Sequence, residues 1–576
     1  MKTHAWVWMG SVVIGLALPL GWAATACSPE TRDFGKGGGT TTGGGGSAGG
    51  GTGCKAGDAV ACYEGPDGTR DVGNCHAGQA ICGADGKPGS CEGQVLPRQP
   101  VDCAAHEDQD CDGVPERCTL DLVWGATYGV SGGAGFVPPS LAVGPGGNIA
   151  YAGWLTGQVD FGLGAMASAT GDADVFVAKF DPTGQALWAK KYGDATEEQR
   201  CNNVRVDGQG NIVLVGEYRG SLDGVGIQMP KNTGGSDAFV IKLDSTGAPL
   251  WVRWGGDPGQ QTAEAVAVNK AGGVVVVGRF EGSFAWNGGG GTLTSSSNGM
   301  VIYVQRFDKN GNSVFSVALG GDPMVYSGQN VYTVALDLND DVIVTGDFQG
   351  NISFPGGPSS TSAGEDDVFI AKLDGKTGDL LWAHTYGTAA SEQGYGVATD
   401  DQGNILMTGK FEGIMTFGGK VVAAMPPNKL GVYLTKLSPA GEVLWAKGYG
   451  GGDNVLGMFV ETAENNSILL AGAFDGTLDF GGGVLDAGGV AGKLSAAGFL
   501  AKLDTDGAHL GSRAFLAAPG DPDAGQPELV IAYRVAATPG THEIVMGGVG
   551  SGPLDLGGGV IGKPGVASPF LAKYAP

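Results

Sequence analysis

The sequence predicts an all-β fold, and three observations lead to this prediction. One unit of about 63 residues recurs from Leu120 to the C-terminus. Each copy contains four short runs in which β-branched or aromatic residues alternate with others, as they do in strands. Four-stranded antiparallel units repeated seven times predict a seven-bladed β-propeller. The glycine that ends the second strand marks the copies at Gly153, Gly216, Gly278, Gly346, Gly409, Gly472 and Gly547.

Within a unit, the residues justify each element in turn. The first strand reads NVRVD or AVAVN, the second NIVLVG or DVIVTG, the third DVFVAKFD or DAFVIKLD, and the fourth LWAKKYG. Between the third and fourth strands, DPTG, DSTG, DKNG and DTDG predict hairpin turns in which glycine takes a positive φ. The units are longer than usual propeller blades, and the excess lies between the second and third strands. There we predict a glycine-turned hairpin or loop, on the same face as the connections between blades.

Three sets of residues recur in register and are therefore predicted to be structural. The tryptophans of the fourth strand should pack between blades. The lysines of the third strand should lay their stems on a sheet face, and the aspartates before that strand should cap turns. These residues are Trp124, Trp188, Trp251, Trp382 and Trp445; Lys179, Lys242, Lys372, Lys436, Lys502 and Lys573; and Asp174, Asp237 and Asp367.

The two ends of the repeat region complete each other. The last unit ends in FLAKYAP, a third strand with no fourth strand after it, while VWGATYG at residues 123–129 is a fourth strand with no unit before it. We predict that the N-terminal strand completes the last blade. This pairing would close the ring and remove two unpaired sheet edges.

These motifs, written together as GN-I-V-x-V/T-G, D-V-F-V-A-K-L-D-x-x-G and L-W-A-K-x-Y-G-G, closely resemble the SBBP-type β-propeller repeat of bacterial surface proteins. The resemblance covers nearly all of residues 120–576. It departs in the third unit (VFSVALGG) and the sixth (LGSRAF), which lack the tryptophan. The resemblance implies an exported propeller and carries no catalytic residues with it.

The N-terminal segments predict export. Residues 1–26 read as a signal peptide, with a basic start and an apolar run too short to be a good membrane span. The stretch ATAC allows ordinary cleavage after Ala26, but it also resembles a bacterial lipobox in which Cys27 is lipidated. We favour the lipid anchor, because a glycine-rich tether follows at residues 27–53. The protein would then sit on the outer membrane or cell surface and touch the membrane only through its lipid.

Residues 54–118 form a cysteine-rich module. Its even number of cysteines in an exported segment predicts four disulfides, whose pairing the sequence leaves open. Asp108, Asp110 and Asp112 alternate in an acidic loop that could bind Ca²⁺, and the surrounding segment resembles a cysteine-rich metal-binding motif of myxobacterial surface proteins. An acidic turn without an ion is the alternative. The cysteines are Cys54, Cys62, Cys75, Cys82, Cys91, Cys103, Cys111 and Cys118.

Composition and motifs limit the functions that the protein can have. A net charge of −25 repels phosphate backbones, so we expect no nucleic-acid partner. The blade connections carry acids and amides that could bind glycan hydroxyls or a cation, although capping of strand ends is the favoured reading. These candidates are Glu198, Gln199, Gln260, Gln261, Glu392, Gln393, Asp453 and Asn454.

No nucleophile, phosphate-binding or metalloprotease motif is convincing, so we predict no enzyme. The sequence favours a non-catalytic surface lipoprotein that presents its propeller to an extracellular glycan or protein. A structural spacer is the first alternative, and a carbohydrate-active enzyme on a propeller fold is the second.

Overall fold

The computed structural model describes residues 54–66, 69–97, 111, 120–131, 136–168, 172–232, 234–256, 258–295, 299–320, 328–422, 429–450, 455–488, 495–517, 528–562 and 567–576. The chain divides into two compact units, of which the larger contains Arg117–Pro576. The signal peptide, Cys27, the tether and the acidic loop with Asp108, Asp110 and Asp112 lie outside the described residues. No helix in the described ranges is long and apolar enough to cross a membrane.

The cysteine-rich unit is held together by disulfides. Its antiparallel strands β1 (Ala59–Cys62) and β2 (Gly78–Ile81) form a two-stranded sheet. The bonds are Cys54–Cys82, Cys62–Cys91 and Cys75–Cys111, whereas Cys103 and Cys118 lie outside the described residues. The bonded cysteines are 28, 29 and 36 residues apart, so chain entropy alone gives each bond about 3–4 kcal/mol of stabilisation. They compensate for the small apolar core of this unit.

The repeat region folds into seven four-stranded antiparallel blades. Blades 1 and 2 are β5 (Phe136–Val143), β6 (Ile149–Leu155), β9 (Asp174–Phe180) and β10 (Ala186–Tyr192), then β11 (Gln199–Val206), β12 (Ile212–Tyr218), β13 (Asp237–Leu243) and β14 (Pro249–Gly255). Blades 3 and 4 are β15 (Gln261–Val268), β16 (Val274–Phe280), β19 (Val301–Phe307) and β20 (Ser313–Leu319), then β21 (Gln329–Leu336), β22 (Val342–Phe348), β25 (Asp367–Leu373) and β26 (Leu380–Tyr386). Blade 5 is β27 (Gln393–Thr399), β28 (Ile405–Glu412), β31 (Leu430–Leu437) and β32 (Val443–Tyr449). Blades 6 and 7 are β33 (Val455–Thr462), β34 (Ile468–Phe474), β37 (Ser495–Leu503) and β38 (His509–Ala517), then β39 (Glu528–Ala537), β40 (Ile544–Ser551), β43 (Ala567–Tyr574) and β3 (Leu122–Thr127).

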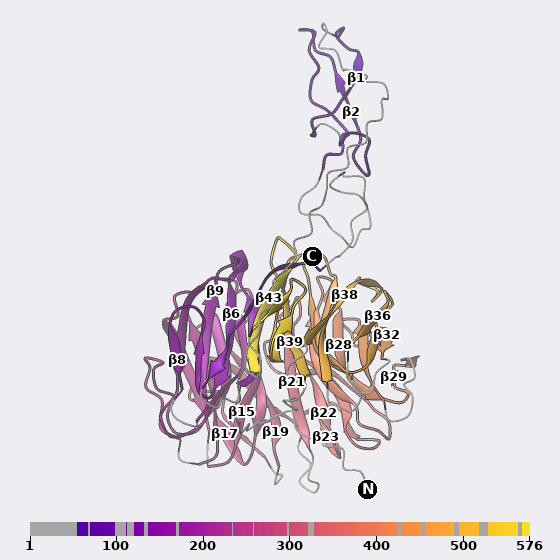
Figure 1. Cartoon of the computed structure of the whole chain (residues 1–576). Coiled ribbons are helices and arrows are strands. Elements are labelled where there is room, and N and C mark those ends of the chain that lie inside the picture. Colours follow the sequence, from indigo (N-terminus) through magenta and orange to yellow (C-terminus); the bar gives the residue numbers. More distant parts are fainter. Residues whose placement is uncertain are drawn as a thin grey trace. The chain divides into compact units, whose positions relative to one another are not determined.

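The predicted closure of the ring is confirmed. Strand β3 pairs antiparallel with β43, so the N-terminal strand is the fourth strand of blade 7. Blade 7 then contacts blade 1 through β39 and β40 against β5. In Figure 1 the yellow strand β43 stands beside the purple strands β6 and β9 of the first blade. All seven first strands contact the first strand of the next blade, so they surround the central channel.

The marker glycine has a steric cause. Each first strand carries a β-bulge opposite the end of the second strand, for example between Cys201 and Asn203. The bulge turns a carbonyl over the glycine: a Cβ on Gly216 would lie 1.9 Å from the carbonyl oxygen of Arg200. The sequence assignment of Gly547 in blade 7 is wrong by one residue. Gly548 pairs with Phe570 where Gly216 pairs with Phe239, and its Cβ would lie 2.1 Å from the carbonyl oxygen of Ile531.

The recurring tryptophans join neighbouring blades. The indole Nε1 of four of them donates to a backbone carbonyl in the turn between the third and fourth strands of the next blade. The bonds are Trp124 to Pro182, Trp188 to Ser245, Trp251 to Lys309 and Trp382 to Pro439, at 3.2, 3.2, 3.0 and 3.2 Å. The ring of Trp445 lies against the turn glycine Gly507 of blade 6, but its Nε1 makes no hydrogen bond within the described residues. The first bond joins blade 7 to blade 1 and therefore helps to close the ring.

The two units without a tryptophan have different explanations. In the third unit Phe315 takes its place, and a Cβ on the turn glycine Gly378 of blade 4 would lie 2.7 Å from its ring. In the sixth unit the position is Gly511, which pairs with Lys502. Blade 7 follows, and its third and fourth strands come from opposite ends of the chain, so no turn joins them for a tryptophan to contact.

The recurring lysines do more than cover a sheet face. Lys242, Lys372 and Lys436 are buried and form ion pairs of 2.8, 2.7 and 2.9 Å with aspartates that follow the first strand of the same blade. These partners are Asp207, Asp337 and Asp400. The aspartates before the third strand vary in role: Asp174 pairs with Lys191 at 2.6 Å, while Asp367 accepts a bond from the backbone of Ala363.

Short hairpins fill most of the extra length between the second and third strands. In the described residues, six blades have one: β7 (Gln158–Asp160) with β8 (Ala165–Ala167), β17 (Ser283–Ala285) with β18 (Thr292–Thr294), β23 (Asn351–Ser353) with β24 (Ser359–Thr361), β29 (Thr416–Phe417) with β30 (Lys420–Val421), β35 (Thr477–Asp479) with β36 (Val484–Asp486), and β41 (Leu554–Asp555) with β42 (Val560–Ile561). Some contact the preceding blade, as β41 does with β38, and β7 pairs with β4 (Val130–Ser131), which follows β3. The end of the propeller that carries them is called the hairpin face below.

Candidate functional site

Two positions of the repeat bring side chains to the channel at the hairpin face. One is the residue after the marker glycine on the second strand, and the other is the residue of the first strand that pairs with it. Because the first strands ring the channel, these side chains from different blades come close together. In order from blade 1, the residues after the glycine are Trp154, Glu217, Arg279, Asp347, Lys410, Ala473 and Val549.

A chain of polar contacts links blades 3 and 4 at this mouth. The guanidinium of Arg279 binds the carboxylate of Glu264, which lies on the bulge of β15, at 3.0 Å. Its other end donates to Asn330 Oδ1 at 2.8 Å, and Asn330 Nδ2 donates to Asp347 Oδ2 at 2.9 Å. The side chains of Arg279 and Glu264 are 25% and 23% exposed, so the pair is held in place but open to a ligand.

Aromatic and charged groups extend this chain on both sides. Towards blade 1, Arg200 lies 5.1 Å above the ring of Trp154 and binds Glu198 at 2.6 Å. Towards blade 5, the rings of Tyr332 and Tyr395 meet edge to face at 5.1 Å. Gln393 then links Tyr395 to Asp366, accepting from the tyrosine hydroxyl and donating to the carboxylate at 3.3 Å. We call the set from Trp154 to Lys410 the polar arc: Trp154, Glu198, Arg200, Glu217, Glu264, Arg279, Asn330, Tyr332, Asp347, Asp366, Gln393, Tyr395 and Lys410.

The remaining part of the mouth is apolar. At the same two repeat positions, blades 6 and 7 carry Leu456 and Ala473, then Ile531 and Val549. The mouth therefore has a hydrogen-bonding side formed by blades 2 to 5, next to Trp154 of blade 1, and an apolar side formed by blades 6 and 7. A ligand that binds here meets both kinds of surface.

Burial shifts the protonation of three charged groups of the polar arc. Burial, reinforced by the charge of Asp366, raises the pKa of Asp347 to about 7, although bonds from Asn330 and Tyr332 act in the other direction. Burial also lowers the pKa of Lys410, despite the nearby carboxylates. Burial and the charge of Glu264 raise the pKa of Glu217. The arc therefore holds a carboxyl group that titrates near neutral pH.

Some of the residues predicted from the blade connections are buried in the structure, and others are more exposed. Gln199, Gln261 and Glu392 are fully buried at the starts of their strands. The amides of Gln199 and Gln261 donate to backbone carbonyls of Arg219 and Glu281, so they hold the loop after the second strand. Glu392 accepts from both the backbone and the hydroxyl of Thr388. This geometry matches the capping interpretation.

The other predicted residues are more open. Glu198 and Gln393 belong to the polar arc, and Gln260 is exposed on the same face. Asp453 and Asn454 lie outside the described residues. No group of three or more histidine, cysteine, aspartate or glutamate side chains in the described ranges is arranged to hold a metal ion. The predicted calcium ligands Asp108, Asp110 and Asp112 are not among those residues.

A second cluster crosses the channel farther from the hairpin face. Arg205 of blade 2 and Arg534 of blade 7 lie 5.6 and 4.5 Å from the centre of the Phe459 ring, which belongs to blade 6. Blades 2 and 6 are not neighbours, so this contact spans the channel. Burial lowers the pKa of Arg534 to about 9, and the positive charge of Arg205 acts in the same direction. The negative charge of Glu461 acts in the opposite direction. These four side chains narrow the channel below the mouth.

The sequence prediction missed most of the polar arc, including Arg279, Asp347 and Lys410. A signal was available: the residue after the marker glycine changes in every blade, while the positions around it repeat. Structural residues of a repeat recur because every blade needs the same packing. A position that varies in chemistry inside such a pattern is therefore a better site candidate than one that recurs.

Comparisons with known proteins give partial matches. No family model matches the chain. An uncharacterized WD repeat-containing protein of Acanthamoeba polyphaga mimivirus is 31% identical over 117 residues, which are 19% of this chain and 8% of that protein. The regulatory protein FlaEY of Caulobacter vibrioides is 28% identical over 179 residues, 31% of this chain and 17% of its own. The matches thus span less than a fifth of either relative.

Solved structures resemble the chain only distantly. BamB from Moraxella catarrhalis gives a TM-score of 0.32 at 13% identity and covers 77% of this chain and 98% of its own. A quinohemoprotein alcohol dehydrogenase from Pseudomonas putida gives 0.35 at 12% identity, covering 83% and 78%. Similarities of this size carry no argument about function. The assignment of an all-β propeller rests on the strand pairings described above.

Proposed function

We propose that the protein is an exported, non-catalytic binding module whose propeller holds a hydroxyl-rich extracellular ligand, such as a glycan, at the mouth of the channel. The observation that carries this proposal is the polar arc itself. Alternating donors and acceptors on several blades can satisfy the hydroxyl groups of a sugar chain. Aromatic rings such as those of Tyr332 and Tyr395 offer flat surfaces for its apolar faces.

The cysteine-rich unit supports the exported location. Disulfides form and persist in oxidising compartments and are rare in the cytosol, and three are present in the described residues. A lipid anchor on Cys27 and a calcium ion at Asp108, Asp110 and Asp112 remain parts of this proposal, as does kinship with the SBBP-type surface repeats. A protein partner at the same mouth is the alternative ligand.

The experiment is a thermal-unfolding scan of the purified chain against a panel of bacterial and plant polysaccharides, with calcium and with EDTA. A ligand that binds only the folded state raises the Tm in a saturable way. The variant Y395A, which removes an aromatic surface of the arc, should lose that response. The matched control L338A changes an exposed side chain in the turn after β21, away from the hairpin face, and should keep it.

The two variants distinguish binding at the mouth from binding elsewhere on the protein. Saturable stabilisation by a polysaccharide that Y395A abolishes and L338A retains would support binding at the mouth. An equal response in both variants would place the glycan elsewhere. A flat response across the panel would refute glycan binding, and crosslinking of a surface protein to residues of the arc would then favour the protein partner.

One observation favours an enzyme as the second candidate. Asp347, with a pKa of about 7 and a neighbouring carboxylate in Asp366, has the protonation behaviour of a general acid. Turnover of any polysaccharide in the panel that falls by several orders of magnitude in D347N would favour this candidate. Binding without turnover would favour the non-catalytic module.

A further inference from the structure

Several buried lysines of the propeller, among them Lys242 and Lys436, belong to a recurring anion-holding arrangement. In blade 2, Asp207 Oδ2 binds Lys242 Nζ at 2.8 Å and accepts from Asn211 Nδ2 at 2.9 Å. Its Oδ1 accepts from the backbone N–H groups of Gln209 and Asn211 at 3.0 and 2.9 Å. Four donor groups from three residues of the blade thus surround one carboxylate.

Blade 5 repeats this arrangement. Asp400 Oδ2 binds Lys436 Nζ and accepts from Asn404 Nδ2, both at 2.9 Å. Its Oδ1 accepts from the N–H groups of Gln402 and Asn404 at 3.0 and 2.8 Å. Burial acts to raise the pKa of Asp400, but these bonds more than offset it and keep the pKa below the ordinary value. The arrangement therefore favours a charged carboxylate.

Blade 1 keeps the donors and lacks the carboxylate. Lys179 and Asn148 stand where Lys242 and Asn211 stand in blade 2, as the matching pairs Val143–Ile149 and Val206–Ile212 show. The turn also has the same backbone bonds, from Gly144 N to Asn148 O and from Gly147 N to Gly144 O. The position of the aspartate, however, is occupied by Gly144.

The lysine of blade 1 binds a backbone carbonyl of the next blade but lacks the carboxylate that its counterparts in blades 2 and 5 bind. Lys179 Nζ donates to the carbonyl oxygen of Ser245 at 2.8 Å, the same type of contact that Lys372 makes with Pro439 in blade 5. Among the described residues, no carboxylate lies within ion-pair distance of it. Burial lowers its pKa, with the charge of Asp244 in the next turn acting in the other direction. An ammonium group has three N–H donors, so two remain for another partner.

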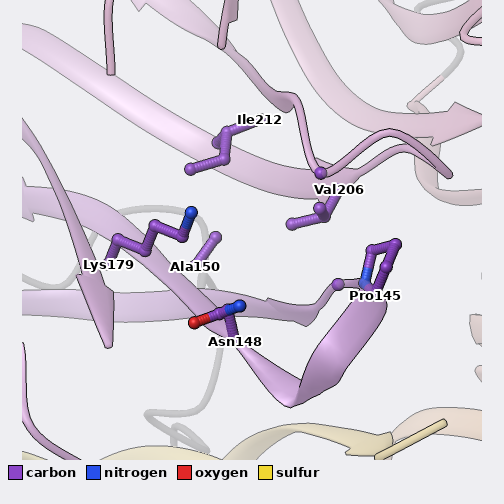
Figure 2. A pocket seen from close by; sticks show the side chains of 8 residues that line it. Pro145, Asn148, Ala150, Lys179, Val206 and Ile212 are labelled. Carbon is purple, nitrogen blue, oxygen red and sulfur yellow. The ribbon is translucent and has the colours of Figure 1, made fainter. Parts of the chain in front are cut away.

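A cavity opens where the missing carboxylate would lie. Figure 2 shows Lys179 and Asn148 on one side of it, with Val206 and Ile212 across from them and Pro145 at its edge. It measures about 20 Å³, more than the roughly 10–15 Å³ that a water molecule needs. Gly144 and Gly210 complete part of its wall, so no side chain among the described residues fills the space.

We propose that this blade 1 cavity binds a small free carboxylate, of which formate is the simplest, in the place of the absent aspartate. Lys179 Nζ and Asn148 Nδ2 would hold one oxygen, and the N–H groups of the Gly144–Asn148 turn would hold the other, as in blades 2 and 5. A formate fits better than a larger acid, because Val206 Cγ1 already lies 2.6 Å from the point where a Cβ on Gly144 would be.

The test is thermal unfolding of the full chain in sodium formate against sodium chloride at equal ionic strength. Formate should raise the Tm of the unaltered protein in a saturable way. The variants K179M and N148A, which each remove one donor, should lose most of this shift. K420M, which removes an exposed lysine on β30, is the matched control and should keep it.

A second variant supplies the missing group from the chain. In G144D/V206A, the shortened valine makes room for an aspartate, which should pair with Lys179 and leave no response to formate. Loss of the response in this variant and in N148A, with retention in K420M, would support the site. No formate effect on the unaltered protein, an equal effect in all variants, or an equal effect of chloride would each overturn the proposal.

Discussion

Exchange of Gly548 for alanine tests the register of blade 7 and the cause of the marker glycine. In G548A the new Cβ would lie 2.1 Å from the carbonyl oxygen of Ile531 and 2.6 Å from the ring of Phe570. Real Cβ atoms essentially never approach another heavy atom within 3.0 Å, so strand β39 must move by about 1 Å. That strand pairs with β40 and faces the channel, which leaves little freedom to adjust. We expect a loss of about 3 kcal/mol, the upper end of the range for overpacked cores.

The neighbouring Gly547 gives an internal control. In G547A the closest atom is Leu141 Cδ2 at 2.8 Å, the end of a flexible side chain, and the next is a ring carbon of Tyr151 at 3.2 Å. We expect about 1 kcal/mol or less from this exchange. Urea unfolding of both full-length variants, followed by tryptophan fluorescence, compares their midpoints. Equal midpoints, or a larger loss in G547A, would refute both the register and the steric argument.

Three further predictions follow from the contacts between and within blades. In K242M the buried carboxylate of Asp207 loses its cation, so we expect a loss of about 3–5 kcal/mol near neutral pH. Because bonds to Lys242 and Asn211 keep the pKa of Asp207 low against the effect of burial, its charged form stabilises the fold only above about pH 4. The K242M penalty in urea unfolding should therefore shrink below that pH, and a constant penalty would contradict this assignment. In W124A the bond that joins blade 7 to Pro182 is lost, and limited proteolysis should cut the N-terminal strand faster than in the exposed-site variant L338A; equal rates would argue against a role in closure. Burial raises the pKa of Asp347 to about 7, so the unaltered protein should lose stability as the pH rises from about 4 to 7, by up to about 1.4 kcal/mol per pH unit. D347N should remove this slope in Tm measurements, and parallel curves would contradict it.

The fold could be predicted because the residues that recur in each unit are those that every blade needs for its packing. The orphan strand at residues 123–129 and the incomplete last unit predicted ring closure correctly, since an unpaired sheet edge is costly wherever it occurs. Even the missing tryptophan of the sixth unit has a structural reason, because blade 7 has no turn to receive it. The error at Gly547 shows the limit of this reasoning. Two adjacent glycines look alike in a sequence, and only the carbonyl that the bulge places over Gly548 distinguishes them.

The candidate site was harder to predict, because its residues do not share a chemistry. Glu217, Arg279, Asp347 and Lys410 occupy one repeat position in successive blades but carry alternating charge. They come together only because the blades form a ring. The acid and amide residues chosen from the sequence recurred instead, and Gln199, Gln261 and Glu392 proved to be buried caps of strand ends. The side chains that meet across the channel are set by closure of the ring. The sequence of a single unit carries no information about that closure.

Repetition and its exceptions thus lead to two kinds of site in this molecule. At the hairpin face, a position that every blade varies gives the mouth of the channel its mixture of charge, amide and aromatic groups. In the turn after the first strand, a position that several blades conserve as aspartate is glycine in blade 1, while the lysine and asparagine around it are kept. Unlike Lys242 and Lys436, Lys179 is only partly buried, and its ammonium group has N–H donors beyond the one that binds Ser245. Blade 6 also lacks the aspartate, because Ala463 stands in its place while Lys502 is kept, so the retained lysine alone does not point to a ligand. What distinguishes blade 1 is the cavity beside Lys179 and Asn148, and the response to formate tests whether an anion fills it.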